Sequence, residues 1–440
     1  SALTDNTTGD ANTAVGMNCL LANTTGSNNT AVGAQALDAN TTGAGNVAVG
    51  QHALTTNNAD YGVAVGHNCL YDNSTGSANV AIGRQCLYNN TTGQRNIAIG
   101  DRPMDANTTG DYNLAIGYAA LYKSNTDYNL AIGADSLHNM TTGQSCIAVG
   151  YQALLGNTTG NYNLAIGYKA GSTNSTAGQN TFIGYRAGEV SNGSDVTYIG
   201  FDSGLHATGS SNTCVGHRTM DAENCTGGQN TAIGRECLGA LTTGSNNTAL
   251  GYLAGHDITS HSSNTFIGYG AGSIATGEVN TYVGTNAGAN MTTGGYNICL
   301  GYAANASSNN STGQCVLGDS NIGSLRCNTQ TISSLSDRRD KTDIVDLPIG
   351  LEFINKLKPR KFKWETRDGN IKDGTVRSGF IAQELQEAQI DCDYVNLVLD
   401  ENPDKLEASE ANLIPVLVNA VKELSAENTA LKQRLDAAGL

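Results

Sequence analysis

The feature that most constrains the fold is a short motif of a small residue, a branched aliphatic residue and a glycine, which recurs nineteen times. Its closing glycines are Gly16, Gly33, Gly50, Gly66, Gly83, Gly100, Gly117, Gly133, Gly150, Gly167, Gly184, Gly200, Gly216, Gly234, Gly251, Gly268, Gly284, Gly301 and Gly318. Successive glycines lie 16 to 18 residues apart, mostly 17. So short and regular a period predicts a stacked array of coils, each stabilised by its neighbours.

One repeat unit is Asn79-Val-Ala-Ile-Gly-Arg-Gln-Cys-Leu, followed by Asn89-Asn-Thr-Thr-Gly. The pattern predicts two short strands per unit. The first ends at the aliphatic–Gly pair, and the second is the Cys-Leu or Ala-Leu segment that follows. Asn-Thr-Thr-Gly suits the turn into the next coil, because Gly tolerates positive φ and Asn caps turns. These triplets also match a glycosylation sequon, but their place in the period favours the turn.

Strand residues alternate between two faces, so the motif also predicts an interior. We expect the aliphatic residue, such as Val15 or Ile82, to point inward and the small residue before it, such as Ala81, to face outward. Aromatic residues such as Phe182 at that place imply an outer face with room for a partner. The Asn that heads each unit is expected to stack as a hydrogen-bonded ladder.

Tyrosine often follows the corner glycine. These tyrosines are Tyr118, Tyr151, Tyr168, Tyr185, Tyr252, Tyr269 and Tyr302. Two interpretations fit this pattern: packing at the corner of the coil, or an exposed aromatic ladder that contacts sugar.

Charge divides the chain in two. Residues 1–335 hold nine of the 24 Lys and Arg and nineteen of the 39 Asp and Glu, so residues 336–440 are far richer in charge. We therefore expect a repeat region at 1–318, an extended connector at 319–335 and a separate domain at 336–440.

Composition argues against several classes of protein. The net charge of −15 disfavours a nucleic-acid binder, which needs a basic face. No run of 18 apolar residues occurs, so we expect no membrane insertion, and no secretion signal is recognisable at the start. The eleven cysteines contain no Cys-x-x-Cys pair and are interpreted as reduced, buried residues. We expect neither a metal nor a cofactor.

The Asn–x–Ala–Ile–Gly unit resembles the head repeats of trimeric autotransporter adhesins. That resemblance implies a left-handed parallel β-roll in each chain, with three rolls packed together. At about 4.8 Å per coil, nineteen coils would make a rod of roughly 90 Å. An intertwined triple-stranded β-helix remains an alternative, and both arrangements are homotrimeric.

The last 105 residues contain several characteristic sequence blocks that follow one another in a fixed order along the chain. They are Ser336-Asp337 with Lys341, Leu351 to Trp364, Ser378 to Leu385, Tyr394 to Leu397, and Leu413 to Leu424. Together these blocks resemble the C-terminal intramolecular chaperone domain of phage tail fibres and tailspikes, of the auto-processing endosialidase type. The sequence departs from that pattern at Asp340, usually aliphatic, and at Asp343, where Asn is common.

This resemblance implies a single-turnover serine endopeptidase that acts on its own chain. Ser336 would be the nucleophile, Lys341 the base, and the cut would fall between Leu335 and Ser336. A serine hydroxyl needs a base, and lysine can serve only where burial or a nearby cation lowers its pKa. Asp337 and Arg338 are possible supporting residues, with Arg338 or Arg339 supplying charge or pairing with Asp337.

Apolar residues near the C-terminus recur every three or four positions, as in a coiled coil. The expected seam consists of Ile414, Leu417, Val421, Leu424, Asn428, Leu431 and Leu435, on a helix of about 411–437. Asn428 would fix the register of three chains. A single amphipathic helix packed on a globular core is the alternative. Phe362 and Trp364 are expected core residues.

These observations favour a trimeric viral tail fibre or appendage that is assembled in the host cytoplasm. In the virion it would contact other virion proteins and a host cell-surface receptor, for which a glycan is one candidate. Two alternatives are a polysaccharide-degrading tailspike and a cellular trimeric adhesin. The first needs paired carboxylates in a cleft, and the nearest acidic groups are Asp101 with Asp105, and Asp221 with Glu223 and Glu236.

Overall fold

The computed structural model describes residues 2–322, 336–363, 376–400 and 406–439. It divides into two compact units, Ser1–Leu317 and Gly318–Leu440, which are described separately. The expected cleavage residue Leu335 and the expected core residue Trp364 lie outside the described residues, as does most of the expected connector.

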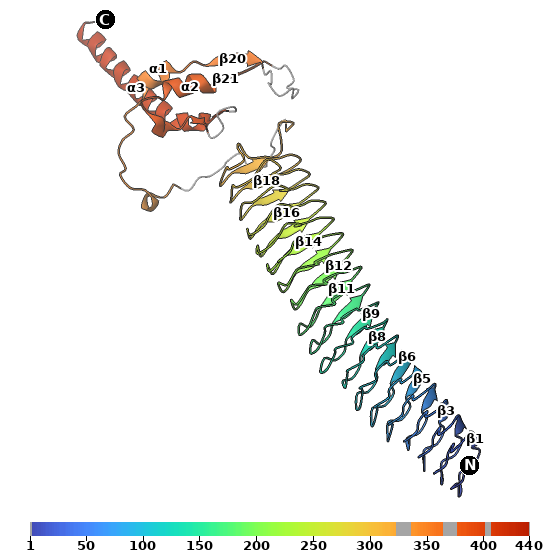
Figure 1. Ribbon diagram of the computed structural model, residues 1–440. Coiled ribbons are helices and arrows are strands. Elements are labelled where there is room, and N and C mark those ends of the chain that lie inside the picture. The colour runs from blue at the N-terminus through green and yellow to red at the C-terminus, as the bar shows by residue number, and fades with distance from the viewer. Residues whose placement is uncertain (1, 323–335, 364–375, 401–405, 440) are drawn as a thin grey trace. The chain divides into compact units, whose positions relative to one another are not determined.

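The first unit is a parallel β-solenoid with one short strand in each coil (Figure 1). Its strands are β1 (Thr13–Val15), β2 (Thr30–Val32), β3 (Val47–Val49), β4 (Val63–Val65), β5 (Val80–Arg84), β6 (Ile97–Asp101), β7 (Leu114–Ile116), β8 (Leu130–Ile132), β9 (Ile147–Val149), β10 (Leu164–Ile166), β11 (Thr181–Ile183), β12 (Thr197–Ile199), β13 (Thr213–Val215), β14 (Thr231–Ile233), β15 (Thr248–Leu250), β16 (Thr265–Ile267), β17 (Thr281–Val283), β18 (Ile298–Leu300) and β19 (Cys315–Leu317).

Each strand pairs in parallel with the next strand of the same chain. The repeats stay in register, so that Ala31 pairs with Ala48 and Ala165 with Phe182. The predicted mainly β solenoid of about 17 residues per turn is therefore confirmed. Because consecutive strands pair within one chain, the arrangement is a self-contained solenoid and not an intertwined triple helix.

The prediction of a second strand in each unit was wrong. The segment after the corner is a turn, in which two residues per coil adopt positive φ, such as Gln35 at 59° and Leu37 at 52°. The corner glycine is required by geometry. At Gly83, φ is 133° and an added Cβ would lie 1.8 Å from the carbonyl oxygen of Gly100 in the next coil.

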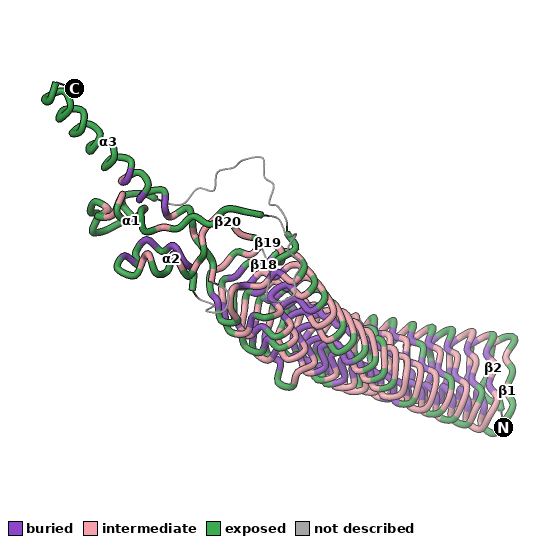
Figure 2. The backbone as a smooth tube through the Cα atoms, turned by 90° about the horizontal axis from the view of Figure 1, so that it is seen from above, coloured by how far each residue is buried: buried purple, intermediate pink, exposed green. Residues whose placement is uncertain are grey.

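The predicted orientation of the strand residues was also wrong. The central residue, usually alanine, is buried, whereas the aliphatic residue before the glycine faces outward: Ala81 is fully buried and Ile82 is 38% exposed. The coil interior is narrow, and it is filled by leucines of the following turn, such as Leu70 and Leu87. A small central residue leaves room for these leucines. Buried residues therefore line the inside of the coils (Figure 2).

Aromatic residues at the central position also point inward. Phe182 is fully buried, and glycines replace leucine on either side of it. A Cβ added at Gly171 or Gly188 would lie about 2.5 Å from the Phe182 ring, at 2.5 and 2.4 Å respectively. One large ring thus occupies the volume that leucine fills elsewhere, and the expectation of a roomy outer face is corrected.

One column of buried asparagines runs along most of the solenoid, and a second runs from its N-terminal end to Asn174, with interruptions such as Met140. In the predicted ladder, the Asn46 backbone N–H donates to Asn29 Oδ1 at 3.0 Å. A second ladder, missed from the sequence, uses the Asn of the turn triplets: Asn40 Nδ2 donates to Asn23 Oδ1 at 2.9 Å. Both side chains are fully buried, so these two triplets serve the turn and have no side-chain amide exposed for a glycan, whereas Asn6 in the first triplet of the chain is exposed.

Cysteines of the described residues are free, and all are buried except Cys315; Cys327 lies outside the described ranges. In the part of the chain that is described, no helix is long and apolar enough to cross a bilayer. Within the same residues, no cluster of three His, Cys, Asp or Glu side chains is placed to hold a metal ion.

The second unit is a small α+β fold. Its elements are η1 (Arg338–Asp340), α1 (Leu351–Lys356), β20 (Arg360–Lys363), β21 (Val376–Gly379), α2 (Ala382–Ala388), η2 (Asp393–Val395), β22 (Val398–Leu399), β23 (Glu407–Ala408), η3 (Glu410–Asn412) and α3 (Leu413–Ala437). Strands β20 and β21 pair antiparallel, as do β22 and β23. Phe353, Leu385, Leu397, Leu413 and Val416 belong to its core.

Replacement of Phe182 by Ala should destabilise the solenoid by about 3–5 kcal/mol, because a fully buried ring leaves a cavity. The double variant Phe182→Ala/Gly171→Leu should recover part of that loss, since it places a leucine beside Leu154 and between two small central residues, as in other coils. Unfolding followed by circular dichroism measures both. Equal stabilities for the single and double variants would contradict the proposed size complementarity.

Candidate active site

The candidate nucleophile and base lie on either side of the short helical turn η1. Ser336 precedes this turn and Lys341 ends it. The turn is closed by the Lys341 backbone N–H, which donates to the Arg338 carbonyl at 3.2 Å. It brings the two side chains together, and Lys341 Nζ donates a hydrogen bond to Ser336 Oγ. This is the geometry that a serine–lysine pair requires, although the catalytic roles stay a prediction.

Asp337 stabilises the turn and does not contact the pair. Its carboxylate accepts from the Arg339 backbone N–H at 2.9 Å and pairs with the Arg339 guanidinium, with 2.6 Å between Oδ2 and the terminal nitrogen. The hydrogen bonds from Arg339 hold the pKa of Asp337 below its ordinary value. Of the two interpretations offered for the neighbouring arginines, Arg339 therefore pairs with Asp337.

Burial at this site is low. Residues 336–346 are exposed, and Ile344 and Val345 add two exposed apolar side chains just after the pair. Burial is one of the conditions that favour a neutral lysine, and the isolated chain does not provide it here.

Asp343, one of the departures from the expected pattern, has φ of 52°. Asn and Asp are the residues other than glycine that adopt this left-handed conformation most readily. The preference for Asn here thus has a conformational reason, and Asp satisfies it as well.

Helix α3 has two apolar faces. Leu413, Val416 and Ala420 are buried against the unit. Polar side chains reinforce that contact, since Asn419 Nδ2 donates to the Leu347 carbonyl at 2.8 Å and Glu423 accepts from the Leu351 N–H at 2.6 Å.

The predicted seam lies on the other face of α3. Its aliphatic members are 41% to 63% exposed, and Asn428 is exposed as well. The helix therefore packs on its own core, as the alternative interpretation expected, and also presents an uncovered heptad face.

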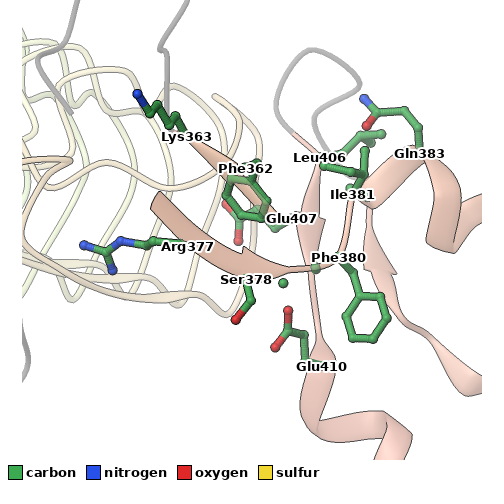
Figure 3. Close-up of a pocket in the computed structure, with 13 residues that line it drawn as sticks. Phe362, Lys363, Arg377, Ser378, Phe380, Ile381, Gln383, Leu406, Glu407 and Glu410 are labelled. Atoms are coloured by element: carbon green, nitrogen blue, oxygen red, sulfur yellow. The ribbon is translucent and has the colours of Figure 1, made fainter. Parts of the chain in front are cut away.

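A groove of about 670 Å³ lies beside β20 and β21 (Figure 3). Phe362, Ile381 and Leu406 supply apolar lining, and Phe362, expected in the core, is only partly buried here. Arg360 joins β20 to α2 through Glu384, with Nε 2.9 Å from Oε2. None of the lining residues belongs to the 336–341 segment, so the groove is separate from the candidate site.

The acidic groups considered for a glycosidase are mostly paired with arginines. Asp101 contacts Arg84 and Asp105 contacts Arg102, each at 2.8 Å. Asp221 lies 2.7 Å from Arg218, and Glu236 lies 3.0 Å from Arg235. These carboxylates stabilise the flank of the solenoid, and their geometry does not favour a pair of catalytic acids.

Six of the seven tyrosines after the corner glycine are exposed, and those of consecutive coils stack on one another. Tyr168 and Tyr185 have ring centroids 5.1 Å apart and planes 9° apart, and Phe201 continues the stack at 5.0 Å. This agrees with the exposed ladder of the second interpretation. The rings cover one another's faces, which leaves mainly edges and hydroxyls for a ligand. Contact with sugar stays a prediction.

Residues 336–394 match the family model described as chaperone of endosialidase, a family of self-cleaving chaperone domains. The match begins at the candidate nucleophile and lies within the second unit. No curated protein and no solved structure matches the chain. The chain thus joins a long β-solenoid to a C-terminal unit that contains this match.

Proposed function

We propose that the chain is a trimeric tail fibre or appendage protein of a virus, which binds a host surface through its solenoid. Its C-terminal domain aligns the three chains and then removes itself by serine autoproteolysis between Leu335 and Ser336. The single observation that carries the proposal is the match to the chaperone of endosialidase family at residues 336–394. The close approach of Lys341 to Ser336 gives that match a chemical mechanism.

A chaperone domain would set the register of three chains, which the repetitive solenoid cannot set by itself. Successive coils present nearly the same strand residues, such as Leu114-Ala-Ile, Leu130-Ala-Ile and Leu164-Ala-Ile. Three such chains could pair in many registers of similar free energy. A non-repetitive domain at one end selects one register.

In the proposed reaction, Ser336 Oγ attacks the carbonyl carbon of Leu335 while Lys341 Nζ accepts the hydroxyl proton. The peptide bond to the Ser336 nitrogen breaks, and that nitrogen takes up the proton from Lys341. Leu335 is then held as an ester on Ser336, which water hydrolyses to a carboxylate and the free hydroxyl. Every bond that forms or breaks lies within this chain or the attacking water.

The exposed state of the pair supports a coupling between assembly and cleavage. Ser336 and Lys341 are exposed in one chain, and so is the seam of α3. Packing of three domains would bury Lys341 and favour its neutral form. Chains would then be cut only after they have assembled.

Ser336→Ala, Lys341→Ala and Lys341→Arg should each leave a full-length chain, whereas the parent protein yields fragments of 335 and 105 residues. The Arg variant tests the base specifically, because arginine keeps its charge but does not give up its proton. Denaturing gels and intact mass measure the outcome. As matched controls, the exposed Ser378→Ala and Lys358→Ala should cut normally. Cleavage in Ser336→Ala would refute the mechanism.

Leu417→Asp combined with Leu424→Asp should weaken trimer formation by about 2–5 kcal/mol per chain, because charge would enter a buried seam. Ala426→Asp, off the seam on the same exposed helix, is the control. Sedimentation after refolding gives the trimer fraction of each variant. Equal fractions for the seam variant and the control would exclude the seam from assembly.

A further inference from the structure

The outer face of the solenoid sheet carries two columns of side chains, one from the first and one from the third residue of each strand; together they are called the apolar stripe. The first column is Thr13, Thr30, Val47, Val63, Val80, Ile97, Leu114, Leu130, Ile147, Leu164, Thr181, Thr197, Thr213, Thr231, Thr248, Thr265, Thr281, Ile298 and Cys315. The second is Val15, Val32, Val49, Val65, Ile82, Ile99, Ile116, Ile132, Val149, Ile166, Ile183, Ile199, Val215, Ile233, Leu250, Ile267, Val283, Leu300 and Leu317.

The stripe is accessible and uncharged. Its second column is aliphatic in all nineteen strands, and Ile166 and Leu250 are 40% and 44% exposed. Charged residues lie on either side of it, at the corner column, where Arg84 pairs with Asp101, and in the turn before the strand, as at Asp111 and Asp127. The strands follow one another along one side of the stacked coils, so the stripe runs the length of this unit (Figure 1).

The stripe is a contiguous apolar surface that repeats in every coil, and its second column alone contains nineteen aliphatic side chains. The largest apolar patch on a typical soluble monomer covers only ~300–600 Å² and often has a function. A continuous stripe of this length, with members such as Leu250 44% exposed, is the kind of surface that marks a protein–protein contact.

The period of the stripe identifies its partner. A partner that covers the whole stripe must present matching rows at the coil spacing, over nineteen coils. A second copy of this chain has that period, that length and the same uncharged surface. The exposed seam of α3 supplies a separate surface for self-association in the second unit.

We propose that the stripe is the surface through which three copies of the solenoid pack, parallel and level with one another, around a common apolar core. This inference rests on the trimer of the proposed function and adds the face that is buried. The corner column, with its stacked tyrosines and its Arg84–Asp101 pair, then forms the rim of the interface.

The test measures protection of single cysteines in the full-length chain, with Cys315 and Cys327 replaced by Ser. Ile166→Cys places a thiol on the stripe, and Thr159→Cys places one on the exposed turn of the same coil. Leu250→Cys and Thr243→Cys form a second pair elsewhere on the solenoid. Modification by a maleimide polymer is followed on denaturing gels, and light scattering gives the mass of each protein in solution.

For a protein of trimeric mass, we expect the stripe thiols to react roughly tenfold or more slowly than the turn thiols. A stripe variant that becomes monomeric while its turn control stays trimeric would support the proposal equally. Trimeric proteins whose stripe and turn thiols react alike would overturn the stripe as the interface and leave the proposed trimer intact. A monomeric parent protein would overturn both.

Should one stripe cysteine prevent folding, the second pair gives the same comparison in a distant coil. Circular dichroism checks each variant before labelling. Because Ile166 and Leu250 point out of the coil, a thiol at either place leaves the buried interior of the chain unchanged.

Discussion

The whole first unit depends on one interaction, the stacking of each coil on the next. Backbone hydrogen bonds between parallel strands supply part of it, and the buried apolar residues and asparagines inside the coil supply the rest. A buried amide is costly unless its donors and acceptors form hydrogen bonds, so an asparagine at these positions requires a hydrogen-bond partner, which the neighbouring coil can supply. This requirement keeps neighbouring coils aligned and explains why the repeat tolerates so little variation in length.

The repeat fixed the fold class from sequence, but not which face of the strand is inside. Hydrophobicity favoured Ile82 over Ala81 as the interior residue, and the structure reverses them. The interior of a coil this narrow is limited by volume, so alanine and leucine share it, and a ring such as Phe182 enters only where glycine replaces leucine. The aliphatic residues then lie on the outer face of the coil, which no rule applied to one coil could reveal.

The candidate site was more predictable, because Ser336 and Lys341 lie five residues apart and one turn of η1 is enough to join them. Pairing of Asp337 with a neighbouring arginine was expected, but the choice of Arg339 over Arg338 depends on the turn geometry. Helix α3 fits both interpretations of its sequence, a helix packed on its own core and a helix with an exposed heptad face. Its heptad face and its core face come from different residues of the same helix, such as Leu417 and Val416.

The in-register pairing of identical coils has an evolutionary consequence. A coil can be duplicated or lost in the middle of the stack without creating a new kind of contact, because its neighbours meet the same surface as before. Each such duplication or loss would lengthen or shorten the solenoid by about 4.8 Å. Recombination can therefore change the length of the solenoid in small steps, while the sequences at both ends of the chain stay unaltered.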